Sequence, residues 1–373
     1  MPSFVRRTRH AVLTACGLVA LASPVRAQRP AGVPAIGHVF VIVLENKEFN
    51  TTFGAGTPAT YLADTLVKAG AFLRQYYGTG HASLDNYIAM VAGIAPNPDT
   101  QGDCGRYVEF EQTGMAPGGQ PVGHGCVYPA HVPTIANQLA ASGRTWKAYL
   151  EDMGKDPSRE AATCAHAPIG APDVTERATP TDQYAAKHNP FVYFHAIIDS
   201  ASCNTHVVPL TGFARDLQAV ATTPNYAYIA PNLCHDGHDT HCRNGEPGGL
   251  VSINAFLQEW VPRITNSPAF RRDGLLIITF DEAPSAHKEA CCHEPSGPNT
   301  LSPGAGGPGG GRTGTVLLSP FIAPGTVSDV PYNHYAMLKS VEQIFGLPYL
   351  GFAGEPGLVG FGRDVYTRGA VRK

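Results

Sequence analysis

Apolar and polar positions along the chain form alternating blocks that predict strands and helices in turn. Strands of this kind alternating with helices of 10 to 17 residues are typical of a parallel sheet covered by helices on both faces. The pattern therefore predicts an α/β fold, a three-layer sandwich with a mainly parallel central sheet. Apolar runs of strand length cover residues 37–44, 71–74, 145–150, 225–230, 275–280 and 315–319, and segments of helical length cover residues 57–69, 83–92, 131–141, 211–221, 249–265 and 334–345.

Three long segments lack this periodicity. Residues 94–128 are rich in Gly and Pro and contain two cysteines, so we expect a pinned loop there. Residues 151–210 are irregular as well and predict a cap or rim segment, and residues 302–314, which are mostly Gly and Pro, predict a loop. The chain has 373 residues, 43% of them hydrophobic and 15% charged, which is enough for one large core. We therefore expect a single domain over residues 28–373.

The first 27 residues have the pattern of an export signal. Three arginines, Arg6, Arg7 and Arg9, precede an apolar stretch, and residues 25–27 suit signal cleavage. A membrane anchor is the alternative, but the stretch is too short for one. A lipobox-like sequence ends at Cys16, yet few apolar residues precede it, which makes lipoprotein anchoring the less favoured alternative. Nothing after residue 30 is long and apolar enough to predict stable membrane insertion, so we expect a secreted or periplasmic protein.

The charge balance argues against a nucleic-acid partner. The formal net charge is −3, and removal of residues 1–27 takes away four arginines and no acidic residue, which lowers it to −7. Proteins that bind nucleic acid usually show a basic balance on at least one face. The sequence leaves the oligomeric state open.

Eight of the nine cysteines lie outside the predicted signal, and an even count in an exported chain indicates disulfides. A zinc site is the weaker alternative because the chain has no C-x-x-C pair. Adjacent cysteines rarely bond to each other, since the eight-membered ring is strained. We therefore expect Cys291 and Cys292 each to bridge to one of Cys234 and Cys242. The remaining pairs would then be Cys104–Cys126 and Cys164–Cys203.

Two of the strand-like apolar runs end in pairs of residues suited to metal binding. One run stops at Glu45 and Asn46, and another stops at Asp281 and Glu282. The carboxyl ends of parallel strands meet at one edge of a sheet, so these residues are expected to lie in one crevice. Carboxylate and amide oxygens suit a divalent cation, whose identity and number the sequence does not define. The alternative is that Glu45 or Glu282 only caps a helix or forms a salt bridge.

A serine at the start of a predicted helix is the candidate nucleophile. Ser83 follows a turn and precedes a helical segment, and a helix N-terminus favours negative charge developing on a phosphate. A serine in this position can attack a phosphorus atom held in the same crevice. A plain N-cap role for Ser83 is the alternative.

Several histidines could contact phosphate or transfer protons, because the pKa of histidine lies near working pH. The polar cluster at residues 231–239 adds groups that could bind substrate, orient a histidine or hold a second metal, and Arg312 could bind phosphate with two parallel hydrogen bonds. His235 of that cluster is as well explained as a solvent-facing residue. The predicted acid/base groups are His81 and His238, and the predicted substrate-binding groups are His188, Asn232, Asp236, Asp239, Arg312 and His334.

Taken together, these motifs resemble a known family. The chain resembles the bacterial phosphoesterase family that contains acid phosphatases and non-specific phospholipases C, a branch of the alkaline phosphatase superfamily. The resemblance covers nearly the whole mature chain and implies an alkaline phosphatase-like fold. The motifs that carry it are VIVLEN at residues 41–46, HASLDNY at 81–87, KHNPF at 187–191, PNLCHDGHD at 231–239, TFDE at 279–282 and YNHY at 332–335.

The resemblance implies a role for each matching residue. Asn86 would donate a hydrogen bond to a phosphoryl oxygen, and Ser83 would form a covalent phosphoserine that water then hydrolyses. The chain departs from the family pattern at Ala82 and Asp85, where proline is common. The residues that would hold the metal are Glu45, Asn46, Ser83, Asp281 and Glu282.

The sequence therefore predicts an exported, metal-dependent phosphoric ester hydrolase acting on a small phosphate ester or a phospholipid. An acid phosphatase-type phosphomonoesterase is favoured over a phospholipase C-type phosphodiesterase, because no C-terminal lipid-binding extension is evident. A hypothesis of another class is a non-catalytic secreted binding protein on the same fold. The retention of Ser83 together with all four acidic or amide ligands argues for the enzyme.

Overall fold

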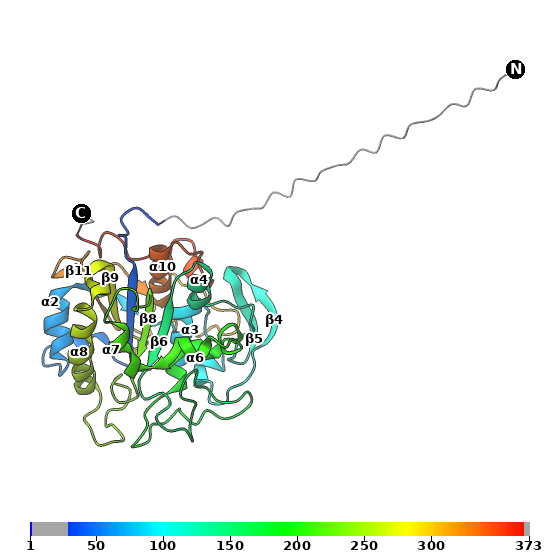
Figure 1. The fold of residues 1–373 in the computed structure, drawn as a ribbon, viewed down its shortest axis with the longest axis horizontal. Coiled ribbons are helices and arrows are strands. Elements are labelled where there is room, and N and C mark those ends of the chain that lie inside the picture. Colours follow the sequence, from blue (N-terminus) through cyan, green and yellow to red (C-terminus); the bar gives the residue numbers. More distant parts are fainter. Residues whose placement is uncertain (2–28, 369–373) are drawn as a thin grey trace.

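A computed structural model describes Met1 and residues 29–368 of the chain. The predicted signal, apart from Met1, and its lipobox cysteine Cys16 lie outside the described residues. Figure 1 shows a central sheet with helices on both sides. The strands of this sheet are β1 (His38–Leu44), β2 (Ala71–Leu73), β6 (Trp146–Leu150), β7 (Val207–Pro209), β8 (Tyr226–Ala230), β9 (Gly274–Phe280), β10 (Thr315–Leu318) and β11 (Thr326–Ser328).

The strands lie in the order β11-β2-β10-β9-β1-β8-β6-β7. All neighbouring pairs are parallel except the two that involve β10, which runs antiparallel to β9 and β2. The expected mainly parallel central sheet is thus confirmed. Strand β1 lies between β8 and β9, and every one of its residues is buried. The carboxyl ends of these three strands therefore open on the same edge.

Two apolar clusters fill the space above and below the sheet. Residues Val39, Val41 and Val43 of β1 face one cluster, and Phe40 and Ile42 face the other, as the alternation of side chains along a strand requires. Helices α3 (Ser83–Ala92), α4 (Ile135–Ala141) and α10 (His334–Phe345) cover the first face. The helical segments on the second face are η1 (Tyr61–Leu66), α7 (Phe213–Asp216), α8 (Leu250–Thr265) and α9 (Pro268–Asp273).

Some predicted elements have different bounds in the structure. The helix expected over 57–69 is a π-helical segment followed by the short α2 (Val67–Ala69), and the helix expected over 211–221 is reduced to α7. The expected loop at 94–128 contains a hairpin of β4 (Glu111–Ala116) and β5 (Gln120–His124), whose strands pair only with each other. The sequence did not predict this hairpin, because its strands bury few side chains and so lack the apolar pattern of a buried strand.

Short elements occupy much of the predicted rim and the remaining connections. The rim segment supplies edge strand β7 and several single-turn helices, so part of it belongs to the sheet. These short elements are α1 (Phe49–Phe53), β3 (Tyr76–Tyr77), η2 (Thr100–Gly102), η3 (Pro117–Gly119), η4 (Ala186–His188), η5 (Pro190–Tyr193), α5 (His195–Ile198), α6 (Cys203–His206), η6 (Leu210–Gly212), β12 (Tyr332–Asn333) and η7 (Gly351–Gly354).

Four disulfides join the eight cysteines. The predicted pairs Cys104–Cys126 and Cys164–Cys203 are confirmed. The predicted cross-links between the loop after β8 and the loop after β9 are wrong, because Cys234 bonds to Cys242 and Cys291 bonds to its neighbour Cys292. The two loops leave β8 and β9, which β1 separates, so their cysteines do not meet.

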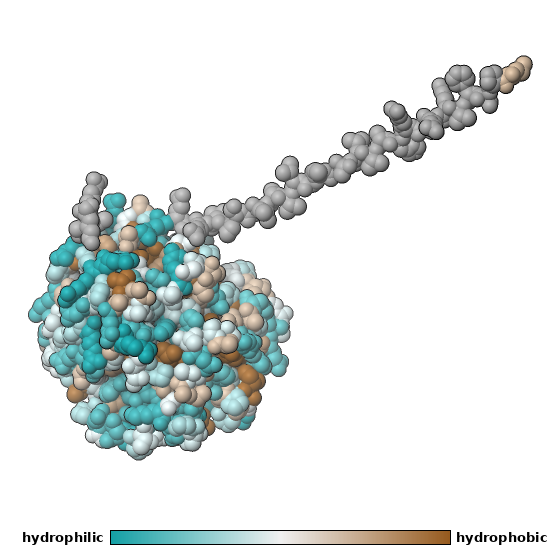
Figure 2. Space-filling model, viewed as in Figure 1, coloured by the Kyte–Doolittle hydropathy of each residue, from teal (hydrophilic) through white to brown (hydrophobic). Residues whose placement is uncertain are grey.

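The surface is mixed in character. On the face shown in Figure 2, apolar side chains occur in small groups between hydrophilic ones. Among residues 29–368, no helix combines the length and the apolar character that crossing a membrane requires.

Candidate active site

The candidate nucleophile lies at the first turn of a buried helix. Ser83 is the first residue of α3 and is only 3% exposed, and every other residue of this helix is buried as well. Its Oγ donates a hydrogen bond of 2.9 Å to Oε2 of Glu45, the residue that follows β1. The hydroxyl therefore already has a carboxylate in position to accept its proton.

Glu45 forms the centre of a buried cluster with His188 and Asp236. The ligand atoms of these three residues all lie within 4.8 Å of one another. His188 Nε2 is 3.3 Å from Glu45 Oε1, and His188 Nδ1 is 3.1 Å from Asp236 Oδ2. Burial lowers the pKa of His188 to about 4 and raises the pKa of Asp236 to about 7. The neutral imidazole that this burial favours is the form that binds metals.

Asp281 and Asn46 border this cluster. Asp281 Oδ1 accepts hydrogen bonds from the backbone N–H groups of Asn46 (3.0 Å) and Glu282 (2.6 Å). Asn46 adopts a positive φ of 53°, which asparagine tolerates better than most residues, and its Nδ2 donates to Glu45 Oε2. Burial raises the pKa of Asp281 well above its usual value, and the nearby charges of Glu45 and Glu282 add to this.

Glu282 points to a different partner. Its Oε2 lies 2.8 Å from Nδ1 of His81, and the other ring nitrogen of His81 donates to the carbonyl of His287 at 2.6 Å. Burial raises the pKa of Glu282 to about 7, although the hydrogen bond and charge of His81 oppose the shift. Burial alone would lower the pKa of His81, but Glu282 and the His287 carbonyl raise it. His81 and Glu282 thus form a buried pair in direct contact.

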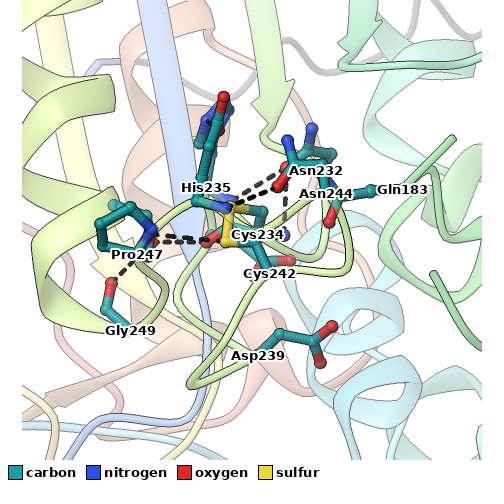
Figure 3. Close-up of a disulfide and its surroundings, with 12 residues drawn as sticks. Gln183, Asn232, Cys234, His235, Asp239, Cys242, Asn244, Pro247 and Gly249 are labelled. Carbon is teal, nitrogen blue, oxygen red and sulfur yellow. Dashed lines mark hydrogen bonds and ion pairs between the residues drawn. A yellow bond between two sulfur atoms is a disulfide. The ribbon is translucent and has the colours of Figure 1, made fainter. Parts of the chain in front are cut away.

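The loop after β8 brings His238 to the same crevice. The Asp236 Oδ1 atom accepts from the backbone N–H of His238 at 2.7 Å, and Asp239 lies 3.0 Å from Nδ1 of His238. The His238 ring centre is 6.2 Å from that of His188. The Cys234–Cys242 disulfide closes this loop, and Figure 3 shows the side chains of His235 and Asp239 on different sides of it.

A metal ion suits the donors that this crevice offers. Among the buried polar atoms of the described residues that have no hydrogen-bond partner, four belong to this crevice: both ring nitrogens of His188, Oδ2 of Asp236 and Oδ2 of Asp281. Buried carboxylates this close together are costly unless a cation compensates them. Carboxylate oxygen, amide oxygen and imidazole nitrogen together suit a divalent ion. The residues present therefore fit the predicted metal.

A family model matches this chain over residues 56–348, and its description is "Phosphoesterase family". The match covers most of the chain and includes Ser83, the His188 segment, the 231–239 loop and the Asp281 pair. The chain belongs to the phosphoesterase family. The predicted resemblance to a phosphoesterase family is thereby confirmed.

Several curated relatives of this phosphoesterase are phosphatases. An acid phosphatase of Aspergillus fumigatus is 25% identical over 320 residues, which cover 85% of this chain and 56% of the relative. A phosphatidylinositol-3-phosphatase of Mycobacterium tuberculosis is 24% identical over 321 residues, 86% of this chain and 81% of that protein. The chain thus spans little more than half the length of the fungal relatives.

Solved structures with a similar fold include an alkaline phosphatase superfamily protein from Vibrio parahaemolyticus. It is 12% identical, with a TM-score of 0.47 over 90% of this phosphoesterase and 74% of that chain. A phosphonate monoester hydrolase from Silicibacter pomeroyi is 9% identical, with a TM-score of 0.48 over 90% and 78% of the two chains.

Two predicted substrate contacts of the phosphoesterase face the protein interior. Asn86 uses its Oδ1 to accept from the N–H groups of Thr79 and Gly80, and its Nδ2 donates to backbone carbonyls of the same turn. His334 is fully buried, with Nε2 donating to the Asp281 carbonyl at 2.5 Å and Nδ1 3.1 Å from the Tyr76 hydroxyl. In this geometry Asn86 and His334 hold the backbone around Ser83 and Asp281.

The side chains of two further predicted contacts, Asn232 and Arg312, have partners other than the Glu45 cluster. Asn232 accepts from the N–H groups of Cys234 and His235 and donates to Asp152, so it shapes the start of its loop. The Arg312 guanidinium lies 3.7 Å above the ring centre of Phe49. His235, for which the sequence left a role in the cluster and a solvent-facing position equally open, is half-buried, and its Nδ1 lies 2.8 Å from Oε1 of Glu151.

The structure adds three residues to the site that sequence reasoning missed. The Tyr87 hydroxyl donates to Glu45 Oε1 at 2.5 Å, and the ring stacks on His188. Lys187 donates to Asp103 Oδ2 at 2.8 Å, and Asp103 Oδ1 accepts from the backbone N–H of residue 84, next to Ser83. Tyr87 lies four residues after Ser83 on one helix face, a spacing that could have indicated it. Asp103 lies in a loop without such a signal.

Proposed function

We propose that this protein is an exported phosphoric ester hydrolase that cleaves phosphomonoesters through a phosphoserine on Ser83. The observation that carries the proposal is the hydrogen bond from Ser83 Oγ to Glu45, beside buried candidate metal-ligand atoms that have no hydrogen-bond partner among the described residues. The phosphatase names of the relatives support the same reaction class. The four disulfides support an oxidising compartment.

The residues of this chain have separate roles in the proposed reaction. Ser83 Oγ attacks phosphorus, the ester P–O bond breaks, and the departing alcohol oxygen takes a proton. Glu45 accepts the Ser83 proton over their 2.9 Å contact. Among the described residues, His238 has a side-chain partner only at Nδ1, which lies beside Asp239, so its Nε2 is the group that exchanges protons with the leaving oxygen and then with water.

Charges around Ser83 prepare the crevice for a phosphate. Lys187 lies beside the N-terminus of α3, and although burial alone would lower its pKa, Asp103, Glu45 and Asp281 raise it and keep it charged. The helix N-terminus adds a partial positive charge. Together with a cation they would offset the buried carboxylates that otherwise repel a phosphate dianion.

The divalent ion would be held by Glu45, Asn46, Ser83 and Asp281, with His188 and Asp236 adding ligands that the sequence assigned to substrate. When bound, it would supply a positive charge that stabilises the negative charge of the transition state. Glu282, also predicted as a ligand, is engaged by His81 and supports Asp281 through the adjoining backbone.

An activity panel tests the proposal. The mature protein is assayed with p-nitrophenyl phosphate, its bis-ester and p-nitrophenyl phosphorylcholine, each after chelation and after metal add-back. Hydrolysis of the monoester alone, restored by metal, supports the phosphomonoesterase. Preference for a diester would indicate the phospholipase C-type alternative, and no turnover of any ester would indicate a binding protein.

Ser83→Ala tests the mechanism. We expect kcat to fall by about 1,000-fold or more, because the covalent route is lost, while the fold is retained and the remaining ligands still hold the metal. A variant that keeps more than about a tenth of the wild-type rate, a barrier change of only ~1.4 kcal/mol, would instead support direct attack by water.

A further inference from the structure

Lys47 is a half-buried lysine at the crevice, and the reaction proposed above gives it no role. Its Nζ donates to the carbonyl of Gly237 at 2.7 Å and to those of Asn46 and Glu45 at 3.2 and 3.4 Å. Its backbone N–H donates to the carbonyl of Glu282 at 3.1 Å. Lys47 therefore connects the segments that follow β1, β8 and β9, which carry most of the candidate metal ligands.

The contact with Gly237 fixes a tight turn. Gly237 lies between Asp236, a proposed metal ligand, and His238, the proposed proton-exchanging group. Its φ of 95° lies in the left-handed region that favours glycine, and a Cβ at this position would lie 2.3 Å from Cδ1 of Ile253 in α8. The turn is thus closely packed against α8, and the hydrogen bond from Lys47 fixes the direction of its carbonyl group.

His238 depends on this turn more than Asp236 does. The backbone of Asp236 is held by two neighbours, because its carbonyl accepts from the N–H of Glu45 at 2.8 Å and its N–H donates to the carbonyl of Asn232 at 2.9 Å. The side chain of His238 is 32% exposed, and Oδ1 of Asp239 lies 3.0 Å from its Nδ1. Loss of the hydrogen bond to the carbonyl of the turn would therefore disturb the imidazole ring and leave the Asp236 backbone in place.

We propose that Lys47 is a positioning residue that orients Nε2 of His238 toward the leaving oxygen of the ester. The proposal rests on the phosphomonoesterase function proposed above and on the proton exchange by His238 within it. Lys47 acts through the Gly237 carbonyl and contributes no atom to the reaction. A lysine suits this role because its ammonium group has three N–H donors, one for each of the three carbonyls that it contacts.

Two other roles for Lys47 predict different results. The charges of Asp236, Glu45 and Asp281 act on the ammonium group, so one alternative is that Lys47 only offsets these carboxylates. Removal of its charge would then alter the hydrolysis of every ester alike. A lysine that only stabilises the fold would also affect all esters equally. A role through His238 instead predicts an effect that depends on whether the leaving group needs a proton.

Two aromatic phosphate monoesters separate these roles: p-nitrophenyl phosphate and benzyl phosphate. p-Nitrophenolate leaves as a stable anion, whereas the benzyl alcohol oxygen needs a proton as it leaves, so only benzyl phosphate depends on His238. For Lys47→Met at saturating metal, we expect kcat/KM to fall about tenfold or more with benzyl phosphate and less than about threefold with p-nitrophenyl phosphate. The ratio kcat/KM reports the step that breaks the ester bond, even where hydrolysis of the phosphoserine limits kcat.

A double-mutant cycle tests whether Lys47 acts through His238. In a His238→Ala background, Lys47→Met should change kcat/KM for benzyl phosphate by less than about twofold, because the orientation of an absent imidazole no longer matters. Lys68→Met, at an exposed lysine of α2, is the matched control and should leave the ratio of the two esters at its wild-type value.

Equal losses with both esters, an unchanged ratio in Lys47→Met, or full additivity with His238→Ala would overturn the role of Lys47 and leave the proposed function standing. Absence of turnover of both esters by the metal-loaded wild-type protein would overturn the proposed function as well. If Lys47→Met does not fold, as judged by circular dichroism, Lys47→Gln replaces it. Its amide is uncharged and has fewer N–H donors, so the same selective loss with benzyl phosphate is expected, and an equal effect on both esters contradicts the proposal.

Discussion

Removal of one hydroxyl group, by Tyr87→Phe, should weaken metal binding without disturbing the fold. The Tyr87 hydroxyl donates to Glu45 Oε1 at 2.5 Å, and both groups are fully buried. The phenylalanine ring keeps the stacking on His188, where the ring centres are 5.2 Å apart and nearly parallel. The substitution therefore removes the hydrogen bond that orients a proposed metal ligand and little else.

The expected size follows from that hydrogen bond. A hydrogen bond to a charged group contributes about 1.5–3 kcal/mol, and loss of a group that orients a metal ligand typically lowers affinity about 10- to 100-fold. These two ranges agree, since ~1.4 kcal/mol is a factor of ten. For Tyr87→Phe we expect the Kd for the metal to rise about 10- to 100-fold, and kcat at saturating metal to return close to the wild-type value.

Competition with a chromophoric chelator measures the metal affinity, and phosphatase assays across a metal titration measure kcat. Tyr193→Phe is the matched control, because Tyr193 is equally buried and its hydroxyl has no hydrogen-bond partner among the described residues. Identical metal affinities for Tyr87→Phe and the wild type would refute the assignment of Glu45 as an oriented ligand.

Three other predictions test the metal, the rim and the active-site loop. Asp281→Ala should lose both bound metal and activity, measured by metal analysis and p-nitrophenyl phosphate hydrolysis, and full activity of metal-free wild-type protein would contradict this. Burial, with the hydrogen bond and charge of Asp182, raises the pKa of Glu160 to about 7, so its contribution to stability is complete below pH 4.5 and is lost as pH rises through 7. Glu160→Gln should therefore raise Tm relative to wild type at pH 7.5 more than at pH 5 in thermal melts, and a constant difference would argue against the shift. Replacement of Cys234 and Cys242 by Ser should lower the free energy of unfolding by about 2.5 kcal/mol, the value expected for the small loop that the disulfide closes, and denaturant unfolding measures this change. The replacement should also reduce kcat, because the loop that carries Asp236 and His238 is no longer constrained, and an unchanged kcat would contradict this.

Local patterns in the sequence determined much of the fold. The bounds of α3 and α10 follow from their apolar periodicity and from the glycines Gly93 and Gly346 that end them. The first and last residues of both helices agree with the prediction. The run that forms β1 was also predicted to within one residue. These features depend on near neighbours in the chain, so the sequence alone defines them. The polar hairpin β4–β5 lacked such a signal because it buries few side chains.

Tertiary structure decided which groups share the crevice. Glu45, His188 and Asp236 come from three distant segments, and only the packing of β1 between β8 and β9 with the rim segment beside them brings their ligand atoms within 4.8 Å. The direction of a side chain after a strand depends on hydrogen bonds from distant residues, as with Glu282 and His81. The sequence by itself therefore determined most strands of the sheet, the position of the candidate nucleophile and the acidic pairs. The folded chain alone decided the partners of Glu282, the inward orientation of Asn86 and His334, and the pairing of Cys291 with Cys292.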